Sequence, residues 1–222
     1  AREVLKKAPV ATYEDLLQKG STPDSYRPTM FDFVAHNALQ FYQAPEQAGA
    51  KASDAFEIPA ESPMFAGTDE FVKWAPKTTD KESRKLRAIR LYQELIRFHS
   101  GDANQDALID ADLWRLAYGK NNAFGEKKNA NYKKALDRFI GKWADHQISA
   151  RARYQLAQVL HGEGDFVVAH KLAKQGVDTY PNSPGGAQCH NLVQQIEAKE
   201  SQVTVERIWN NPQPQVQVKY RN

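Results

Sequence analysis

Cysteine is almost absent from this sequence: Cys189 is the one thiol in 222 residues. A single cysteine cannot form a disulfide within the chain, so a fold held together by internal disulfides is excluded. Cys189 lies in a stretch with helical apolar spacing, and we expect it to be a small, buried apolar side chain.

Long apolar runs and a strong charge of one sign are also lacking. Charged residues interrupt the apolar stretches every three or four positions, which is too often for a membrane span but typical of amphipathic helices. Lysine and arginine total 30 against 27 aspartates and glutamates, and the two signs are interspersed. This pattern predicts no transmembrane segment in this fragment and no nucleic-acid partner, because nucleic-acid binding needs a concentrated basic surface.

The sequence motifs of common catalytic sites are missing. There is no GxSxG, P-loop or GxGxxG pattern, and none of the six histidines forms HExxH or another metal-ligand spacing. We expect these histidines to lie on the surface or at helix ends. The sequence therefore predicts a protein that is not an enzyme and has no cofactor and no metal site.

One stretch resembles a calcium loop in part. Its oxygen-bearing residues occupy loop positions 1, 3, 5 and 9, and these are Asp102, Asn104, Asp106 and Asp110. Ala107 stands where the loop needs glycine, and Leu113 stands where it needs a carboxylate. We instead expect Asp102 or Asn104 to cap a helix, and Asp106, Asp110 and Asp112 to face solvent or a lysine.

Proline is absent between Pro76 and Pro181, and this interval predicts continuous helical hairpins. The spacing of apolar residues predicts helices over residues 29–42, 80–99, 104–118, 129–143, 147–161, 165–179 and 184–199. Thr29 and Thr68 are expected to cap helices, and Gly101 and Gly119 to end them. Residues 44–66 predict a long ordered loop lying on the helices, and residues 120–128 a polar loop.

After Ser201 the apolar period changes from 3.6 to 2. Val203 and Val205 alternate with polar residues, and so do Val216, Val218 and Tyr220. Two strands joined by a turn near residues 210–212 fit this pattern. A hairpin alone is marginally stable, so we expect the start of a larger β domain. We thus divide the chain into a helical domain, residues 1–200, and a β segment, residues 201–222, and expect both ends to be cuts in a longer protein.

The helices also repeat. Asn131 to Ala135 align with Asp165 to Ala169 at an offset of 34 residues, the period of tetratricopeptide (TPR) repeats. Within the second unit, Gly164 suits the turn between helices and Asp165 suits a cap. Small side chains at Ala157 and Ala169 would let the two helices of the hairpin approach closely. The sequence predicts an all-α fold of TPR-like helical hairpins, an α-solenoid, with a short C-terminal β-hairpin.

Three further segments resemble the N-terminal helical region of alpha-2-macroglobulin-like proteins of the Bacteroidetes. They are residues 27–33 (RPTMFDF), 107–113 (ALIDADL) and 186–192 (GAQCHNL). The last of these leads into residues 203–206 and 218–222, which in that family open the first macroglobulin-type β-sandwich. The resemblance covers nearly the whole chain, but its motifs are short and mostly structural.

The resemblance implies a cell-envelope location, as a periplasmic protein or outer-membrane lipoprotein whose larger body traps proteases. The family's thioester motif, Cys-x-Glu-Gln, is absent because His190, Asn191 and Leu192 follow Cys189. This region would then be a non-catalytic helical scaffold or protein-interaction module of a protease inhibitor. Its partners would be the adjoining β-sandwich domains of the parent chain, and an envelope protein or peptide.

A helical solenoid binds its partners on a concave face lined by the first helix of each hairpin. On the best repeat, Arg151, Tyr154, Gln158 and His161 occupy that face and form the candidate binding groove. The alternative is that residues 44–66 or the adjoining sandwich domain fill the groove.

Two other functions stay open. A glycan-binding helical protein, similar to SusD-like lipoproteins, would use tryptophans as stacking surfaces, and the chain has Trp74, Trp114, Trp143 and Trp209. Trp114 and Trp143 also fit core positions of their helices. An enzyme with an unrecognised site would need a deep pocket with converging ionisable groups.

Overall fold

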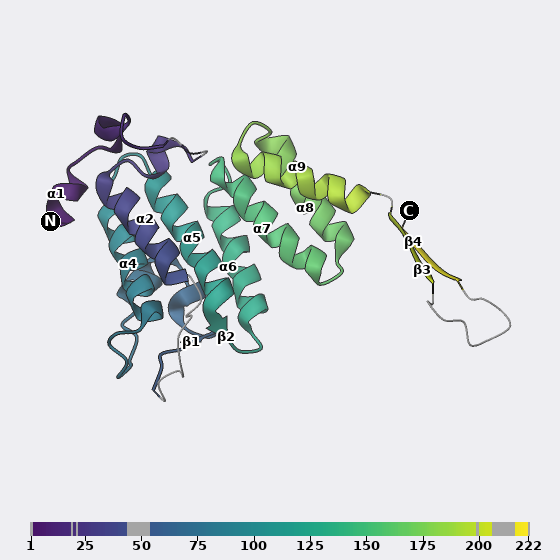
Figure 1. The fold of residues 1–222 in the computed structure, drawn as a ribbon, viewed down its shortest axis with the longest axis horizontal. Coiled ribbons are helices and arrows are strands. Elements are labelled where there is room, and N and C mark those ends of the chain that lie inside the picture. Colours follow the sequence, from purple (N-terminus) through teal and green to yellow (C-terminus); the bar gives the residue numbers. More distant parts are fainter. Residues whose placement is uncertain are drawn as a thin grey trace.

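A computed structural model describes residues 2–18, 20, 22–43, 54–198, 200–205 and 216–221. Within these residues the protein is mostly helical, as expected, with nine α-helices. Their bounds are α1 Arg2–Lys6, α2 Met30–Gln43, α3 Thr68–Lys73, α4 Arg84–His99, α5 Asp106–Asn122, α6 Lys128–Lys142, α7 Ile148–Gly162, α8 Phe166–Thr179 and α9 Pro184–Glu197. Figure 1 shows α5, α6 and α7 side by side, with α8 and α9 beyond them. No helix in the described part of the chain is long and apolar enough to cross a membrane.

The first 28 residues carry structure that the sequence pattern did not predict. α1 and two 3₁₀ turns, η1 (Val10–Tyr13) and η2 (Asp24–Tyr26), precede α2. A short antiparallel bridge pairs Pro9 with Thr29, so the N-terminal segment is joined to the start of α2. η2 packs against α5 and brings Tyr26, which is buried, into the main core.

The capping box at the start of α2 is confirmed. The amide of Thr29 donates to Oδ2 of Asp32 at 2.9 Å, and the amide of Asp32 donates to Oγ1 of Thr29 at 3.4 Å. Two amides that lack helical partners are thereby satisfied at the first turn.

Two other helix starts differ from the prediction. α4 begins at Arg84, not at residue 80, because Ser83 is its N-cap and accepts from the amide of Leu86 at 3.4 Å. α3 begins at Thr68 itself, with Gly67 as N-cap. Thr68 does not cap the helix; its hydroxyl donates to Oδ2 of Asp112 on α5, at 3.3 Å.

Gly119 does not end a helix, and the predicted loop over residues 120–128 is wrong in its first half. α5 continues to Asn122, and the next two residues form β2 (Ala123–Phe124), parallel to β1 (Ile58–Pro59). A methyl group on Gly119 would lie 2.8 Å from Cγ of Met64. The glycine is needed where another segment crosses α5 closely, and not for a change in backbone direction.

The long loop predicted over residues 44–66 is described from residue 54 onward, since residues 44–53 lie outside the described part. Its last turn, η3 (Pro63–Phe65), packs against α5 and α6. Helix side chains donate to its main-chain carbonyls: Asn131 to Ala60 at 2.9 Å and Arg138 to Phe65 at 2.6 Å. These bonds satisfy carbonyl groups that no helix or sheet satisfies, so this part of the loop is ordered, as expected.

The hairpin of α7 and α8 follows the sequence pattern closely. Gly164 adopts a φ of 86°, in the left-handed region that favours glycine. Asp165 caps α8 by accepting from the amide of Val168 at 3.3 Å. α9 then packs against both α7 and α8.

Small side chains allow this three-helix packing. Ala157, Ala169, Ala173 and Cys189 are fully buried in one cluster between α7, α8 and α9. Cys189 is a free thiol, and burial raises its pKa to about 11. The predicted roles of Ala157, Ala169 and Cys189 as small buried residues are confirmed.

A β-hairpin follows the helices and confirms the predicted strands. β3 (Glu200–Val205) pairs antiparallel with β4 (Val216–Arg221), and Val203 stands opposite Val218. Figure 1 shows the hairpin beyond the end of α9. The predicted turn at residues 210–212 lies outside the described residues.

Candidate functional site

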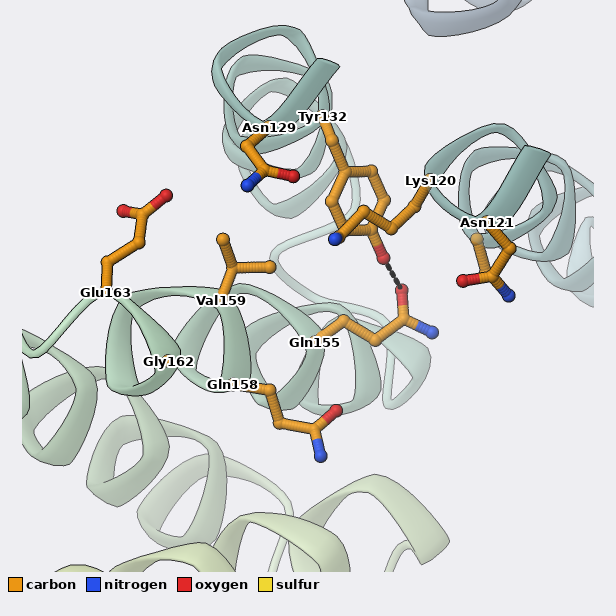
Figure 2. A pocket seen from close by; sticks show the side chains of 10 residues that line it. Lys120, Asn121, Asn129, Tyr132, Gln155, Gln158, Val159, Gly162 and Glu163 are labelled. Atoms are coloured by element: carbon orange, nitrogen blue, oxygen red, sulfur yellow. Dashed lines mark hydrogen bonds between the residues drawn. The ribbon is translucent and has the colours of Figure 1, made fainter. Parts of the chain in front are cut away.

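A groove of about 520 Å³ opens between α5, α6 and α7, and Figure 2 shows it from close by. Polar residues outnumber apolar ones in its lining, which is made by Ala117, Lys120, Asn121, Asn129, Tyr132, Gln155, Gln158, Val159, Gly162 and Glu163. The groove lies between the end of α5, the start of α6 and the second half of α7.

The groove has a fixed floor. Tyr132 is buried, and its hydroxyl donates to Oε1 of Gln155 at 3.0 Å, as the dashed line in Figure 2 shows. This bond joins α6 to α7 beneath the rim. Ala117 and Gly162, two small residues, also line the groove, and a methyl group on Gly162 would meet no atom within 4 Å.

Of the four residues predicted to line a binding groove, Gln158 alone lines this one. Its side chain is exposed and donates from Nε2 to the hydroxyl of Tyr154 at 2.6 Å. Tyr154 packs against the cluster between α7, α8 and α9. Tyr154 thus supports Gln158 from the side and does not reach the groove itself.

Arg151 and His161 have packing roles. The Arg151 guanidinium lies 4.4 Å from the centre of the Trp114 ring, and its Nη1 is 3.4 Å from Oδ1 of Asp110. His161 meets the ring of Phe166 edge-on at 5.1 Å. The prediction therefore named one residue of the groove and three of its neighbours along α7.

The sequence pattern missed the opposite wall of the groove. Lys120 and Asn121 lie on the last turn of α5, in a stretch that we predicted to be a loop, and Asn129 lies on the first turn of α6. A signal was present in the amide side chains themselves, since Asn and Gln recur at the ends of three consecutive helices. Their meeting in space depends on how far α5 extends.

The predicted alternative, in which the long loop fills the groove, receives no support from residues 54–66. These residues pack against α5, α6 and β2, and none of them lines the groove. The remainder of that loop, residues 44–53, lies outside the described residues.

Two acidic residues of this part of α5, Asp110 and Asp112, are not at the surface, contrary to our expectation, whereas Asp102 is exposed and Asp106 is half-buried. Asp110 is fully buried between Arg151 and Arg27, and Asp112 is 4% exposed and paired with Arg115. Burial raises the pKa of Asp110 to about 6, although Arg151 and Arg27 oppose that shift. The N-cap of α5 is Gln105, and not Asn104 or Asp102 as expected, although Oδ1 of Asn104 accepts from the amide of Asp106 at 2.8 Å.

No group of three or more His, Cys, Asp or Glu side chains in the described part of the chain is arranged to hold a metal ion. The carboxylates of the calcium-like stretch instead separate along α5. Asp106 pairs with His146 at 2.8 Å, while Asp110 and Asp112 pair with different arginines. Each carboxylate therefore has its own basic partner, and the Asp112–Arg115 pair lies within α5 itself.

Two histidines are buried: His99 lies at the end of α4, as the prediction of helix-end positions allows, whereas His36 lies inside α2, contrary to that prediction. His99 is 1% exposed and lies between two carboxylates, with Nε2 2.7 Å from Oδ1 of Asp32 and Nδ1 2.7 Å from Oδ2 of Asp102. Burial alone would lower the pKa of His99, but these hydrogen bonds outweigh it and the pKa is raised. His36, also buried, has a pKa lowered to about 3 by burial and then by Arg27.

The contacts of His99 with Asp32 and Asp102 predict how stability depends on pH. His99 binds its proton more tightly in the folded chain, so its contribution is full below its ordinary pKa of 6.5 and falls as pH rises through the raised pKa. The pKa of Asp32 is lowered despite burial, so its contribution is full above 3.8 and falls in acid. We expect His99→Gln to reduce the loss of stability between pH 6.5 and 9, measured as the urea midpoint. His190→Gln, an exposed change on α9, should show the same loss of stability as the wild type. If the urea midpoint falls equally with pH in both variants, the contacts of His99 with Asp32 and Asp102 do not cause the loss.

The described tryptophans have little free ring surface. Trp74, Trp114 and Trp143 are half-buried against the core. Arg151 covers one face of Trp114, and Lys142 lies 4.7 Å from the Trp143 ring centre. Trp74 also lines a separate cavity of about 410 Å³ together with Phe56. Trp209 lies outside the described residues.

Comparisons with family models, with curated proteins and with solved structures find no match to this chain. The candidate site is an open groove with a hydrogen-bonded floor and a rim of amide side chains.

Proposed function

We propose that this chain is a non-catalytic, TPR-like helical scaffold that binds protein segments through the groove between α5, α6 and α7. The observation that carries the proposal is the packing of α7, α8 and α9 on small buried side chains, at the period of a TPR unit. Such packing leaves the first helices of successive hairpins free to form a common face.

The chemistry of the groove favours binding over catalysis. Its two charged residues are Lys120 and Glu163, and Glu163 pairs with Lys133 at 2.5 Å. Neither lies beside a nucleophile or a histidine in the lining, and burial raises the pKa of Tyr132, which makes its hydroxyl a poorer acid. Amide groups, in contrast, are well suited to hydrogen bonding with a polypeptide.

We further propose that the module belongs to an envelope alpha-2-macroglobulin-like protein, as the sequence resemblance implies. The C-terminal hairpin supports this, because two strands leave open edges that more strands would extend. In this arrangement the helices position the protease-trapping body and the hairpin connects to it.

The proposal is tested with the purified 222-residue chain. We expect no hydrolysis of a fluorescent casein, of ester substrates or of polysaccharides, and no covalent adduct when an active protease is added. A covalent adduct with the protease that methylamine prevents would overturn the proposal, and so would hydrolysis that survives repurification.

Glycan binding remains the second candidate, through Trp74 and Phe56, and the covered faces of Trp114 and Trp143 argue against it. The measurement is a glycan array with Trp74→Ala as control. Glycan binding by the wild type that is lost in Trp74→Ala would favour glycan binding as the function.

A further inference from the structure

The groove carries a more specific inference, which rests on the proposed function. We propose that it binds an extended, acidic polypeptide segment, with the carboxamides holding the segment's main chain and Lys120 holding an acidic side chain. Three observations support this: unused amide groups on facing walls, an uneven charge balance, and a rigid floor.

The amide groups come from all three helices. Asn121 lies on α5, Asn129 on α6 and Gln158 on α7, and all three side chains are exposed. In the described part of the chain Asn121 and Asn129 make no side-chain hydrogen bond, and Gln158 uses Nε2 but not Oε1. A carboxamide has both a donor and an acceptor, the same pair that each peptide unit of an extended chain presents. Facing carboxamides can therefore hold a main chain without selecting its side chains.

The charges of the groove also favour one kind of peptide ligand over others. Glu163 is already neutralised by Lys133, whereas Lys120 forms no ion pair with any described residue. The groove thus presents one uncompensated positive charge beside Asn121. An acidic side chain would satisfy Lys120, and a basic one would be repelled.

Other occupants fit less well. A nucleic acid would need several cations, and the groove has one free lysine. A sugar would need an open aromatic face, but Tyr132 is 3% exposed and its hydroxyl is already bonded to Gln155. A second copy of the chain is an outcome that the experiment separates.

The floor favours binding because it does not have to be ordered by the ligand. Tyr132 belongs to the main core, and its bond to Gln155 fixes α6 against α7. Less conformational entropy is lost on binding to a preformed groove than to a mobile surface.

The test measures binding of three pools of fluorescein-labelled decapeptides to the 222-residue chain by fluorescence anisotropy. The pools are random at alternate positions and carry Glu, Gln or Lys at the others. We expect the Glu pool to bind about tenfold more tightly than the Lys pool, with the Gln pool between them. Equal affinity for all three pools would overturn the charge argument and the proposal with it.

Matched variants separate the main-chain and acid contacts. Asn129→Ala should weaken every pool by about tenfold, the loss of one or two hydrogen bonds. Lys120→Gln should weaken the Glu pool and strengthen the Lys pool, so that both approach the affinity of the Gln pool, which should stay unchanged. Gln175→Ala and Lys174→Gln, exposed changes on α8, should have no effect. Groove variants that bind like the wild type would place the peptide elsewhere and contradict the proposal.

Light scattering on the same samples tests for a second copy. A dimer that Asn129→Ala disrupts would mean that the groove serves self-association and would overturn the peptide proposal. Absence of binding by every pool, with unchanged circular dichroism, would also overturn it while leaving the scaffold proposal intact. Hydrolytic activity, in contrast, would overturn the scaffold and leave the peptide measurement to stand by itself.

Discussion

Gly185→Ala is expected to destabilise the chain by about 3 kcal/mol, because α9 meets α7 there with no room for a side chain. A methyl group at this position would overlap the backbone nitrogen of Arg151 and lie 2.9 Å from the carbonyl carbon of Ala150. Both atoms belong to the first turn of α7 and cannot rotate away as a side chain can. The added methyl group must therefore push α9 off α7.

Cys189 offers a local report of that displacement. Its thiol is fully buried between α8 and α9, and its Sγ donates to the carbonyl of Ala150 at 3.3 Å. In Gly185→Ala we expect a lower urea midpoint and much faster reaction of the thiol with Ellman's reagent. In the wild type burial protects the thiol and raises its pKa, so the reaction should be slow.

Gly141→Ala is the matched control. Gly141 lies in α6, and a methyl group there would meet no atom within 4 Å. The same chemical change should then stabilise the chain by up to about 1 kcal/mol through helix propensity, with the thiol still protected. A Gly185→Ala protein with the wild-type midpoint and a protected thiol would contradict the close approach of α9 and α7.

The contrast between these glycines shows what the sequence could predict. Gly164 follows a helical pattern and precedes a capping residue, and its positive φ was predicted correctly from that local context. Gly119 has an equally suggestive local context, yet it lies inside a helix because Met64 crosses it. A local pattern cannot distinguish a helix end from a close contact with a segment 55 positions away in the chain.

The same limit applies to the acidic residues of α5. We expected Asp110 and Asp112 at the surface because they are charged, but α5 is surrounded on most sides, so they are buried. Their arginine partners include Arg27 and Arg151, which are far away in the sequence. The position of α5 at the centre of the fold decided their environment, and periodicity alone does not report that position.

The groove was predictable in part for a related reason. The sequence pattern of α7 singled out Gln158, which lines this groove. The facing wall includes the last turn of α5. The prediction omitted this turn because it ended the helix at Gly119. Because this one helix end was wrong, Lys120 and Asn121 were not predicted to line the groove.

The buried Arg115 carries the other large effect that we expect. Its guanidinium donates to Oδ1 of Asp112, from Nε at 3.0 Å, and to the carbonyls of Met64 and Ala66, from Nη1 at 2.8 and 3.1 Å. The group also lies 4.6 Å from the centre of the Phe71 ring. A single side chain therefore satisfies a buried carboxylate and two carbonyls of the segment that includes η3.

Arg115→Met should cost about 3–5 kcal/mol in the free energy of unfolding, because it leaves the Asp112 carboxylate buried without its partner. Adding Asp112→Asn should recover part of that loss, since the unpaired charge is then gone. Arg138→Met is the control: Arg138 is exposed and makes one bond to the same segment, so we expect a loss of about 1 kcal/mol. Urea unfolding measures all four proteins, and limited proteolysis reports release of residues 60–66. A double variant no more stable than Arg115→Met would show that the carbonyl contacts, and not the ion pair, hold this segment against α5.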